Sequence, residues 1–402
     1  MRKTCLALSL LILTGCASQP VNTHGIEPSE EPVLPESCDS TYINEELDYF
    51  LNDGDELPKG YEWSVVSGDA KIIDGCLQKT ESSDEYEQII LSAKDSTGTY
   101  ELERLLLDPW SGYIISYFSE KGDEAERMKL AYTFDCKYWF KLYEDKAVLS
   151  AESGTKRLRD PALFRKPDGT FGVTATQGYD TDSIYVFDSP DLITFENERL
   201  LKVNASTEDA KLSEEQAWAP EIFWDHTIGR YVILWSSVKD GSMFFNTSSD
   251  LNAFSYPQKL ELTDHAVIDG TVVKDGHQWL ICAKDEREPM EEHSQLFFGF
   301  SDTSWHDWQT VSGPVTGHQS EGPMIMKDLE GPGWYLYYDD YTRFQFKALY
   351  LSGLEDPSIR EIEDSELLIP LDAPAHSYAL PFTWKEMELI QNAYGNRVGG
   401  SD

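Results

Sequence analysis

The sequence predicts an all-β protein, a five-bladed β-propeller preceded by a small β-sandwich. Two observations carry this prediction: a repeat of aromatic-rich strands, and the lack of helical periodicity between them. Five such runs end in a Ser or Thr turn, and the turn residues lie 56, 59, 53 and 51 residues apart: Thr133, Ser189, Ser248, Ser301 and Ser352. A repeat of this length with several short strands is typical of a propeller, because each blade buries its faces only against its neighbours. A parallel α/β fold would need a helix between successive strands, for which the spacing leaves no room.

Residues 1–15 precede both domains, and we interpret them as a signal peptide. Two basic residues stand before an apolar run, Leu6 to Leu13, that is too short to span a bilayer as a permanent helix. The run ends in Leu-Thr-Gly-Cys16, which resembles the lipobox of bacterial lipoproteins. The resemblance implies an exported protein anchored to a membrane through a lipid on Cys16. Ala17 favours the outer membrane, on its periplasmic or cell-surface face. An ordinary secretory signal with a chance cysteine is the alternative.

Residues 16–37 are rich in Pro, Glu and Ser, so we expect a disordered tether. Residues 38–108 form the predicted β-sandwich domain, because short alternating runs there are separated by Gly, Asp and Ser clusters. The clearest of these runs are Tyr61–Val66, Lys71–Ile73 and Gln88–Ala93. Residues 109–395 hold the five repeats and form the predicted propeller domain. Helical periodicity returns only at its end, in Thr383–Tyr394, where we expect a closing helix.

The 38–108 segment resembles the degenerate bacterial Ig-like domains found ahead of secreted glycosidases. The similar stretches are Leu57–Ser64, Asp74-Gly75 and Ile89–Ala93. The resemblance implies a spacer or packing role, with a sugar-binding module as the alternative. Cys38 and Cys76 lie in this one small region of an exported protein and are candidates for a disulfide.

The charge and the missing motifs exclude several classes of function. The chain carries 72 acidic and 33 basic residues, a formal net charge of −39. This balance argues against a nucleic-acid partner or an anionic membrane surface. No Cys and His spacing suggests zinc, and the sequence has no Gly-x-Ser-x-Gly, phosphate loop or His-Glu-x-x-His. We expect a monomer that needs no cofactor for its chemistry.

Polar or aromatic residues begin several apolar runs at intervals that match the blade period. Five of them follow one another at 58, 51, 52 and 55 residues: Asp160, Trp218, Asp269, Glu321 and His376. The innermost strands of a propeller line a central channel, so residues at equivalent positions meet at one end of it. Inverting hydrolysis of an acetal needs one carboxylic acid for the leaving oxygen and a second carboxylate to activate water. A third acid would hold up the pKa of the proton donor by like-charge repulsion.

These motifs resemble those of glycoside hydrolase family 43. The similarity extends from about Tyr113 to Leu389 and rests on four stretches in a fixed order: Arg159-Asp160-Pro161, Trp218-Ala-Pro-Glu221, Ile268-Asp269 and Glu321-Gly-Pro323. The resemblance implies an inverting glycosidase in which Asp160 is the general base, Asp269 the pKa modulator and orienting acid, and Glu321 the general acid. It further suggests an exo-acting α-L-arabinofuranosidase or β-xylosidase for plant or algal polysaccharides and their oligosaccharides.

Three further residues are candidates for binding. Trp218 offers an aromatic face to the apolar side of a sugar, and Arg343 could reach a sugar hydroxyl from the last blades. His376 falls where the family often has a channel histidine associated with calcium, so the resemblance suggests a structural Ca²⁺ in the propeller channel. However, His376 lacks the Arg before it and the Gly after it that many relatives carry.

Two other functions remain open. One is a non-catalytic surface lipoprotein that keeps the propeller and captures glycans for a transporter. The other is an enzyme of the same clan that cleaves a different linkage, in galactan or in an algal polysaccharide. Endo- or exo-action depends on whether loops block one end of the channel.

Overall fold

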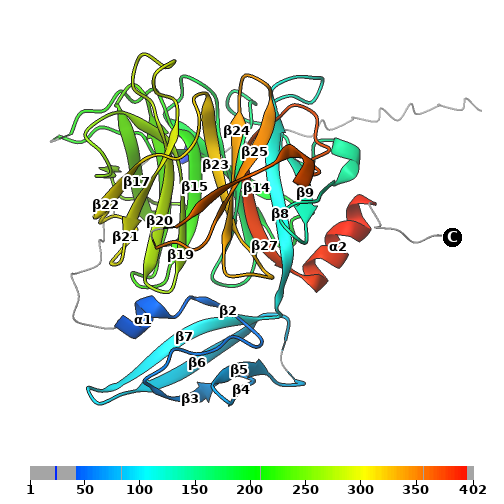
Figure 1. Cartoon of the computed structure of the whole chain (residues 1–402), viewed down its shortest axis with the longest axis vertical. Helices are drawn as coiled ribbons and strands as arrows, with labels where there is room; N and C mark the ends of the chain where they lie inside the picture. The colour runs from blue at the N-terminus through cyan, green and yellow to red at the C-terminus, as the bar shows by residue number, and fades with distance from the viewer. Residues whose placement is uncertain (1–22, 25–41, 83, 209, 356, 396–402) are drawn as a thin grey trace, which may run out of the picture.

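The computed structural model describes residues 23–24, 42–82, 84–208, 210–355 and 357–395. Most of these residues form five blades arranged as a propeller, each built on four antiparallel strands, with a smaller body below it (Figure 1). The prediction of an all-β, five-bladed propeller is therefore confirmed. No helix in the described ranges is long and apolar enough to cross a membrane.

The strands of each blade are given from the innermost outward. Blade 1 holds β27 (Pro374–Thr383), β8 (Trp110–Ser119), β9 (Lys129–Thr133) and β10 (Trp139–Lys141). Blade 2 holds β11 (Arg159–Arg165), β12 (Phe171–Thr176), β13 (Ser183–Ser189) and β14 (Glu196–Lys202), with β1 (Thr23–His24) parallel to β14. Blade 3 holds β15 (Trp218–Asp225), β16 (Arg230–Ser237), β17 (Ser242–Ser248) and β18 (Gln258–Lys259). Blade 4 holds β19 (Val267–Asp275), β20 (Gln278–Asp285), β21 (Leu296–Ser301) and β22 (Thr310–Pro314). Blade 5 holds β23 (Ser320–Lys327), β24 (Trp334–Asp340), β25 (Gln345–Leu351) and β26 (Ile359–Ile362).

The innermost strands close into a ring. β11, β15, β19 and β23 contact one another in this order, and β27 contacts both β23 and β11. Blade 1 closes the ring because β27, from the end of the domain, pairs antiparallel with β8 from its beginning. Five hydrophobic clusters each join two neighbouring blades. Blades 2 and 3, for example, share a cluster that includes Phe164, Val186, Ile233, Trp235 and Phe254. This shared burial explains the repeat of about 50 residues, since no blade has a core of its own.

Two short 3₁₀ turns and one helix complete the propeller. The turns are η1 (Tyr143–Asp145) and η2 (Asp364–Glu366). The helix α2 (Trp384–Tyr394) lies within the expected stretch. Thr383 caps it: its side chain accepts from the N–H of Glu386, whose carboxylate returns to the N–H of Thr383. Ring closure itself comes from the strand β27 that precedes this helix.

The smaller body is a four-stranded sheet with an added hairpin and a helix. The sheet runs in the order β2 (Phe50–Asn52), β7 (Thr99–Leu107), β6 (Glu87–Lys94) and β3 (Glu62–Ser67). The hairpin pairs β4 (Ala70–Ile73) with β5 (Cys76–Lys79), and the short helix α1 (Tyr42–Glu46), which the strand pattern did not predict, packs into the same core. The strands expected from the sequence lie within one residue of β3, β4 and β6. The Ig-like character of this body stays a prediction, and Cys38 lies outside the described residues.

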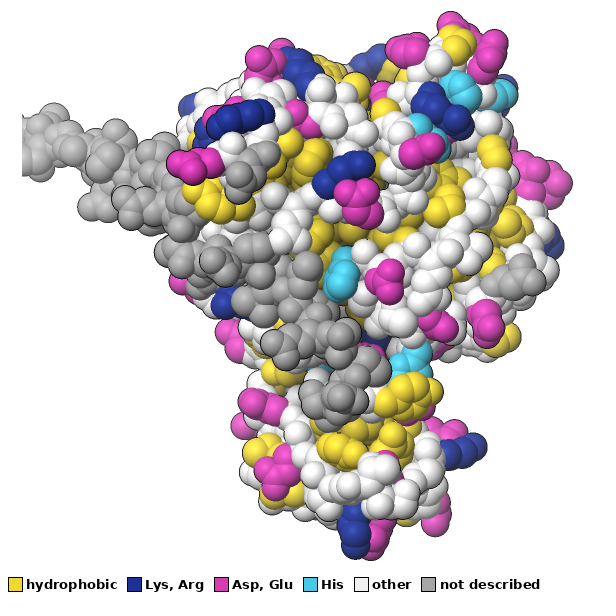
Figure 2. All heavy atoms as spheres, turned by 90° about the vertical axis from the view of Figure 1, so that its left-hand side faces the viewer, with side chains coloured by type: hydrophobic (Ala, Val, Ile, Leu, Met, Phe, Trp, Pro, Cys, Tyr) yellow, Lys and Arg dark blue, Asp and Glu magenta, His cyan; other side chains and the backbone are white. Residues whose placement is uncertain are grey.

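The smaller body covers the end of the channel where the innermost strands finish. Its Tyr49 hydroxyl donates to the carbonyl of Pro167, after β11, and His226 Nε2, after β15, lies 2.7 Å from the carbonyl oxygen of Asn44. Lys274, near the end of β19, pairs with Asp48 at 2.9 Å. Figure 2 shows this body as a separate lobe below the propeller, with acidic side chains scattered over both. The contacts between the two bodies thus lie at the end of the channel where the innermost strands finish, opposite the end where these strands begin.

Candidate active site

All five innermost strands carry the same irregularity near their first residues. The register with the second strand shifts between Arg159 and Ala162, Trp218 and Glu221, Ile268 and Thr271, Glu321 and Met324, and Ala375 and Tyr378. Inside each of these bulges one residue has a left-handed backbone: Asp160 (φ 47°), Ala219 (φ 44°), Asp269 (φ 54°), Gly322 (φ 55°) and His376 (φ 32°). Bulges re-aim side chains, and positive φ at residues other than glycine concentrates at functional sites.

The bulges show which residues occupy equivalent positions in the five blades, and they differ in part from those that the spacing predicted. The residues at equivalent positions are Asp160, Ala219, Asp269, Gly322 and His376. Trp218 and Glu321 therefore each lie one residue before the equivalent position, and the expectation of strict equivalence is wrong for these two. Spacing alone could not show this, because the lengths of the connections vary by several residues between blades.

The bulges surround a cavity of about 350 Å³. Five predicted site residues line it: Asp160, Trp218, Asp269, Glu321 and His376. The structure does not bring Arg343 into this cavity. The Arg343 side chain is 68% exposed and pairs with Asp340 at 3.1 Å, whereas Tyr341 and Phe344 of the same turn do line the cavity. Cys16 lies outside the described residues.

Asp269 is a buried carboxyl at the floor of the site. It is 8% exposed, and its backbone N–H donates to Oγ of Ser236 on the neighbouring blade. Burial raises the pKa of Asp269 to about 6; the charge of His376 opposes this shift, and the charge of Glu321 adds to it. Its protonation therefore depends on the charges of the groups around it.

Asp160 and a second buried acid both contact His376. The Nδ1 atom of His376 lies 3.7 Å from Oδ1 of Asp160, and its backbone N–H donates to Oδ2 of Asp339 at 2.6 Å. Asp339 faces Glu321 across the β23–β24 ladder and is 3% exposed. Burial raises the pKa of Asp339 well above its usual range, although the hydrogen bond from His376 opposes the shift. Its Oδ1 has no hydrogen-bond partner among the described residues.

Glu321 is held by a buried lysine. The Nζ atom of Lys284, whose side chain is 3% exposed, lies 3.0 Å from Oε2 of Glu321 and 3.0 Å from Oε2 of Glu286. Burial lowers the pKa of Lys284, but the negative charges of Glu321, Asp269 and Glu286 outweigh it, so the pKa is raised overall. Lys284 therefore stays an ammonium ion inside the site.

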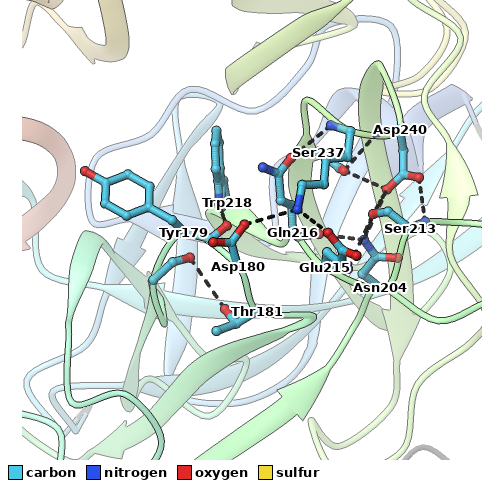
Figure 3. A network of polar contacts seen from close by, with 12 residues as sticks. Tyr179, Asp180, Thr181, Asn204, Ser213, Glu215, Gln216, Trp218, Ser237 and Asp240 are labelled. Carbon is cyan, nitrogen blue, oxygen red and sulfur yellow. Dashed lines mark hydrogen bonds and ion pairs between the residues drawn. The ribbon is translucent and has the colours of Figure 1, made fainter.

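The rim on the side of blades 2 and 3 is fixed by polar contacts (Figure 3). The indole N–H of Trp218 donates to the carbonyl of Tyr179 at 2.9 Å, and the two rings meet edge to face with centroids 6.1 Å apart. Lys239 bridges Asp180 and Glu215, which ties two loops of the rim together. These two contacts restrain the indole ring at the rim of the cavity.

The family is decided by a match to a family model. A model described as a probable glycosyl hydrolase domain, related to glycoside hydrolase family 43, matches residues 108–388, more than half of the chain. The chain belongs to this family 43-related group of glycosyl hydrolases. Family membership makes the chain a glycosidase, as the sequence motifs predicted. A comparison with curated proteins finds no match.

Similar solved structures include three from glycoside hydrolases. An endo-1,4-β-xylanase from Bacteroides thetaiotaomicron is 12% identical; the match covers 63% of this chain and 91% of that one, with a TM-score of 0.44. An α-L-arabinanase from Cellvibrio cellulosa, complexed with arabinohexaose, is 13% identical, with 71% and 96% covered and a TM-score of 0.41. A thermostable family-43 glycoside hydrolase is 16% identical, with 50% and 71% covered and a TM-score of 0.41.

The sequence prediction missed several residues that line the cavity of this glycosidase. The main ones are Lys284, Asp339, Glu286, Arg159 and Tyr179. Lys284 and Asp339 stand at the ends of the second strands β20 and β24, which run antiparallel to the innermost strands and return to the same mouth. A polar residue that ends the second strand of a blade is therefore a usable signal.

Two observations on the glycosidase concern groups outside the three acids. Glu221, the last residue of the Trp218-Ala-Pro-Glu221 motif, is 7% exposed and does not line the cavity. Burial raises its pKa to about 8, while its hydrogen bond with Thr271 opposes the shift. Within the described ranges, no three His, Cys, Asp or Glu side chains gather closely enough to hold a metal ion. The calcium ion suggested for His376 stays a prediction.

Proposed function

We propose that the chain is an inverting, exo-acting glycosidase that releases single α-L-arabinofuranosyl or β-D-xylosyl units from plant or algal polysaccharides and their oligosaccharides. One observation carries the proposal: Asp160, Asp269 and Glu321 come from three blades and line one cavity. Its volume of about 350 Å³ lies at the small end of the range for ligand pockets, which favours one or two sugar units over a long chain.

The three acids have distinct roles in the proposed reaction. Glu321 gives its proton to the glycosidic oxygen as the bond from that oxygen to the anomeric carbon breaks. Asp160 takes a proton from a water molecule, whose oxygen bonds to the anomeric carbon from the opposite face. Asp269 is buried and neither gives nor takes the transferred proton. Its own protonation depends on the charges of its neighbours Glu321 and His376. Attack from the opposite face inverts the anomeric configuration.

The charge of the cavity favours a neutral sugar. Six carboxyl groups line it, from Glu120, Asp160, Asp269, Glu286, Glu321 and Asp339, against the two permanent cations of Arg159 and Lys284. Both cations are already paired with carboxylates, Arg159 with Glu120 at 2.8 Å and Lys284 with Glu321 at 3.0 Å. A uronate or a sulfated sugar would meet net repulsion here.

The sequence also suggests where in the cell the enzyme acts. We propose that the enzyme is exported and anchored to the outer membrane through a lipid on Cys16. The lipobox-like stretch that ends at Cys16 supports this. Labelling cells with a radioactive fatty acid, with Cys16→Ser as the control, tests it: a label that persists in the variant contradicts the anchor.

A hydrolysis screen tests the activity. The purified protein is incubated with aryl α-L-arabinofuranoside, β-D-xyloside and β-D-galactoside, and with arabinan, xylan and galactan. We expect turnover of a pentoside. In Asp160→Asn and in Glu321→Gln, turnover of the matching polysaccharide, whose leaving oxygen needs a proton, should fall by about 10²- to 10⁴-fold. NMR of the first product should show the inverted anomer. Undiminished activity in both variants, or a retained anomer, would remove the assignment.

A further inference from the structure

Lys284 is the feature of the site that the proposed reaction does not yet explain. Its ammonium group is buried, at 3% side-chain exposure, and it sits among the carboxylates of the cavity. It lies 3.0 Å from Oε2 of Glu321 and 5.4 Å from the centroid of the Tyr341 ring. Burying a lysine is costly unless each of its donors is directed to a partner.

The fold fixes the ammonium in this place. Lys284 lies opposite Ile268 in the β19–β20 ladder, directly beside the bulge that holds Asp269. Glu286, only 13% exposed, takes a second contact from the same Nζ at 3.0 Å. Two carboxylates from different parts of the chain contact Nζ. The position of the ammonium group is therefore fixed by its own blade and does not depend on the side chain of Glu321 alone.

This placement distinguishes the two oxygens of Glu321. Oε2 accepts from Lys284, so a proton on the carboxyl resides on Oε1. When Oε1 gives this proton to the glycosidic oxygen, the carbon–oxygen bond of the substrate breaks and Glu321 becomes a carboxylate. An ammonium ion 3.0 Å away stabilises the charge that develops on Glu321 in this step.

We propose that Lys284 is a positioning residue for acid catalysis, which directs the proton of Glu321 to Oε1 and stabilises the carboxylate left behind. This inference rests on the proposed role of Glu321 as the general acid. In this role Lys284 acts through Glu321 and not directly on the substrate. Replacing Lys284 should therefore lower kcat most for substrates whose leaving group must be protonated.

The test compares leaving groups in Lys284→Met, Lys284→Arg and the wild-type protein. The substrates are a methyl glycoside, whose leaving oxygen needs a proton, and the 2,4-dinitrophenyl glycoside of the same sugar, whose leaving oxygen does not. We expect kcat on the methyl glycoside to fall by about 10- to 100-fold in Lys284→Met, and by less than about threefold on the dinitrophenyl glycoside. Lys284→Arg keeps the cation and should recover most of the loss.

Lys347→Met is the matched control for removing a lysine. Lys347 pairs with Asp364 on blade 5 and does not line the cavity, so both substrates should turn over at wild-type rates. Should Lys284→Met not fold, Lys284→Gln replaces it. Equal losses on both substrates, or no recovery in Lys284→Arg, would overturn the inference.

Glu321→Gln separates this inference from the proposed function. A loss confined to the methyl glycoside in Glu321→Gln supports the acid role whatever Lys284 does. If Glu321→Gln loses both substrates equally, the acid assignment fails, and the inference about Lys284 fails with it.

Discussion

Replacing Glu386 with Gln should destabilise the whole chain, because Glu386 forms an ion pair buried where three parts of the molecule meet. Arg165 in blade 2 binds it with both terminal nitrogens, at 2.6 and 3.0 Å, and the two side chains are 3% and 4% exposed. The hydroxyl of Tyr86, from the smaller body, donates to the same carboxylate at 2.8 Å, and the N–H of Thr383 donates at 2.8 Å. The substitution leaves the guanidinium of Arg165 buried without a counter-charge.

The cost can be worked from this geometry. Breaking a buried pair by neutralising one partner typically costs about 3–5 kcal/mol of the free energy of unfolding. At about 2–4 °C for each kcal/mol, the melting temperature should fall by roughly 6–20 °C. Thermal melts followed by circular dichroism measure the shift, with guanidinium unfolding as the second probe.

An exposed ion pair supplies the control. Lys347 and Asp364 lie 2.6 Å apart, with side-chain exposures of 21% and 68%, so Asp364→Asn should cost less than about 1 kcal/mol. If Glu386→Gln costs no more than Asp364→Asn, the ion pair does not stabilise the junction and the reasoning is refuted.

Two further changes test the site and its surroundings. Trp218→Ala removes the aromatic face at the rim, so KM should rise by about tenfold with a smaller change in kcat, measured by steady-state kinetics; an unchanged KM contradicts the sugar-platform role. Glu221 has a pKa of about 8 in the folded protein, above its usual value, so the native state keeps a proton that the unfolded state loses. This one group should therefore lower the stability of the wild type by up to about 1.4 kcal/mol for each pH unit as pH rises from 5 to 8. Burial also raises the pKa of Asp269 and of Asp339, which add to the slope, so Glu221→Gln should make the slope shallower in denaturant titrations; parallel slopes would contradict the protonated state.

The repeat of aromatic strands was enough to predict the propeller, because blades that share cores repeat their hydrophobic pattern. The same spacing predicted that Asp160, Asp269 and Glu321 meet at one end of the channel, and all three line one cavity. It could not predict Lys284 or Asp339, which come from second strands and lie far from the innermost strands in the repeat. It also misplaced Arg343, since a turn of four residues can direct one side chain to the cavity and the next to solvent. Backbone angles decide which way each side chain of a turn points, and amino-acid composition does not determine these angles.

The position of the last innermost strand affects how the enzyme folds during synthesis. β27 supplies both the inner wall of blade 1 and His376, whose ring and backbone contact Asp160 and Asp339. During synthesis the chain emerges from its N-terminus, so blades 2 to 5 can form while blade 1 still lacks its innermost strand. The pocket stays open on one side until residue 383 has been made. The ring and the site are thus completed in the same step. A chain cut before β27 would expose the edge of β8 that pairs with β27 and the side of β23 that packs against β27, and it would lack His376.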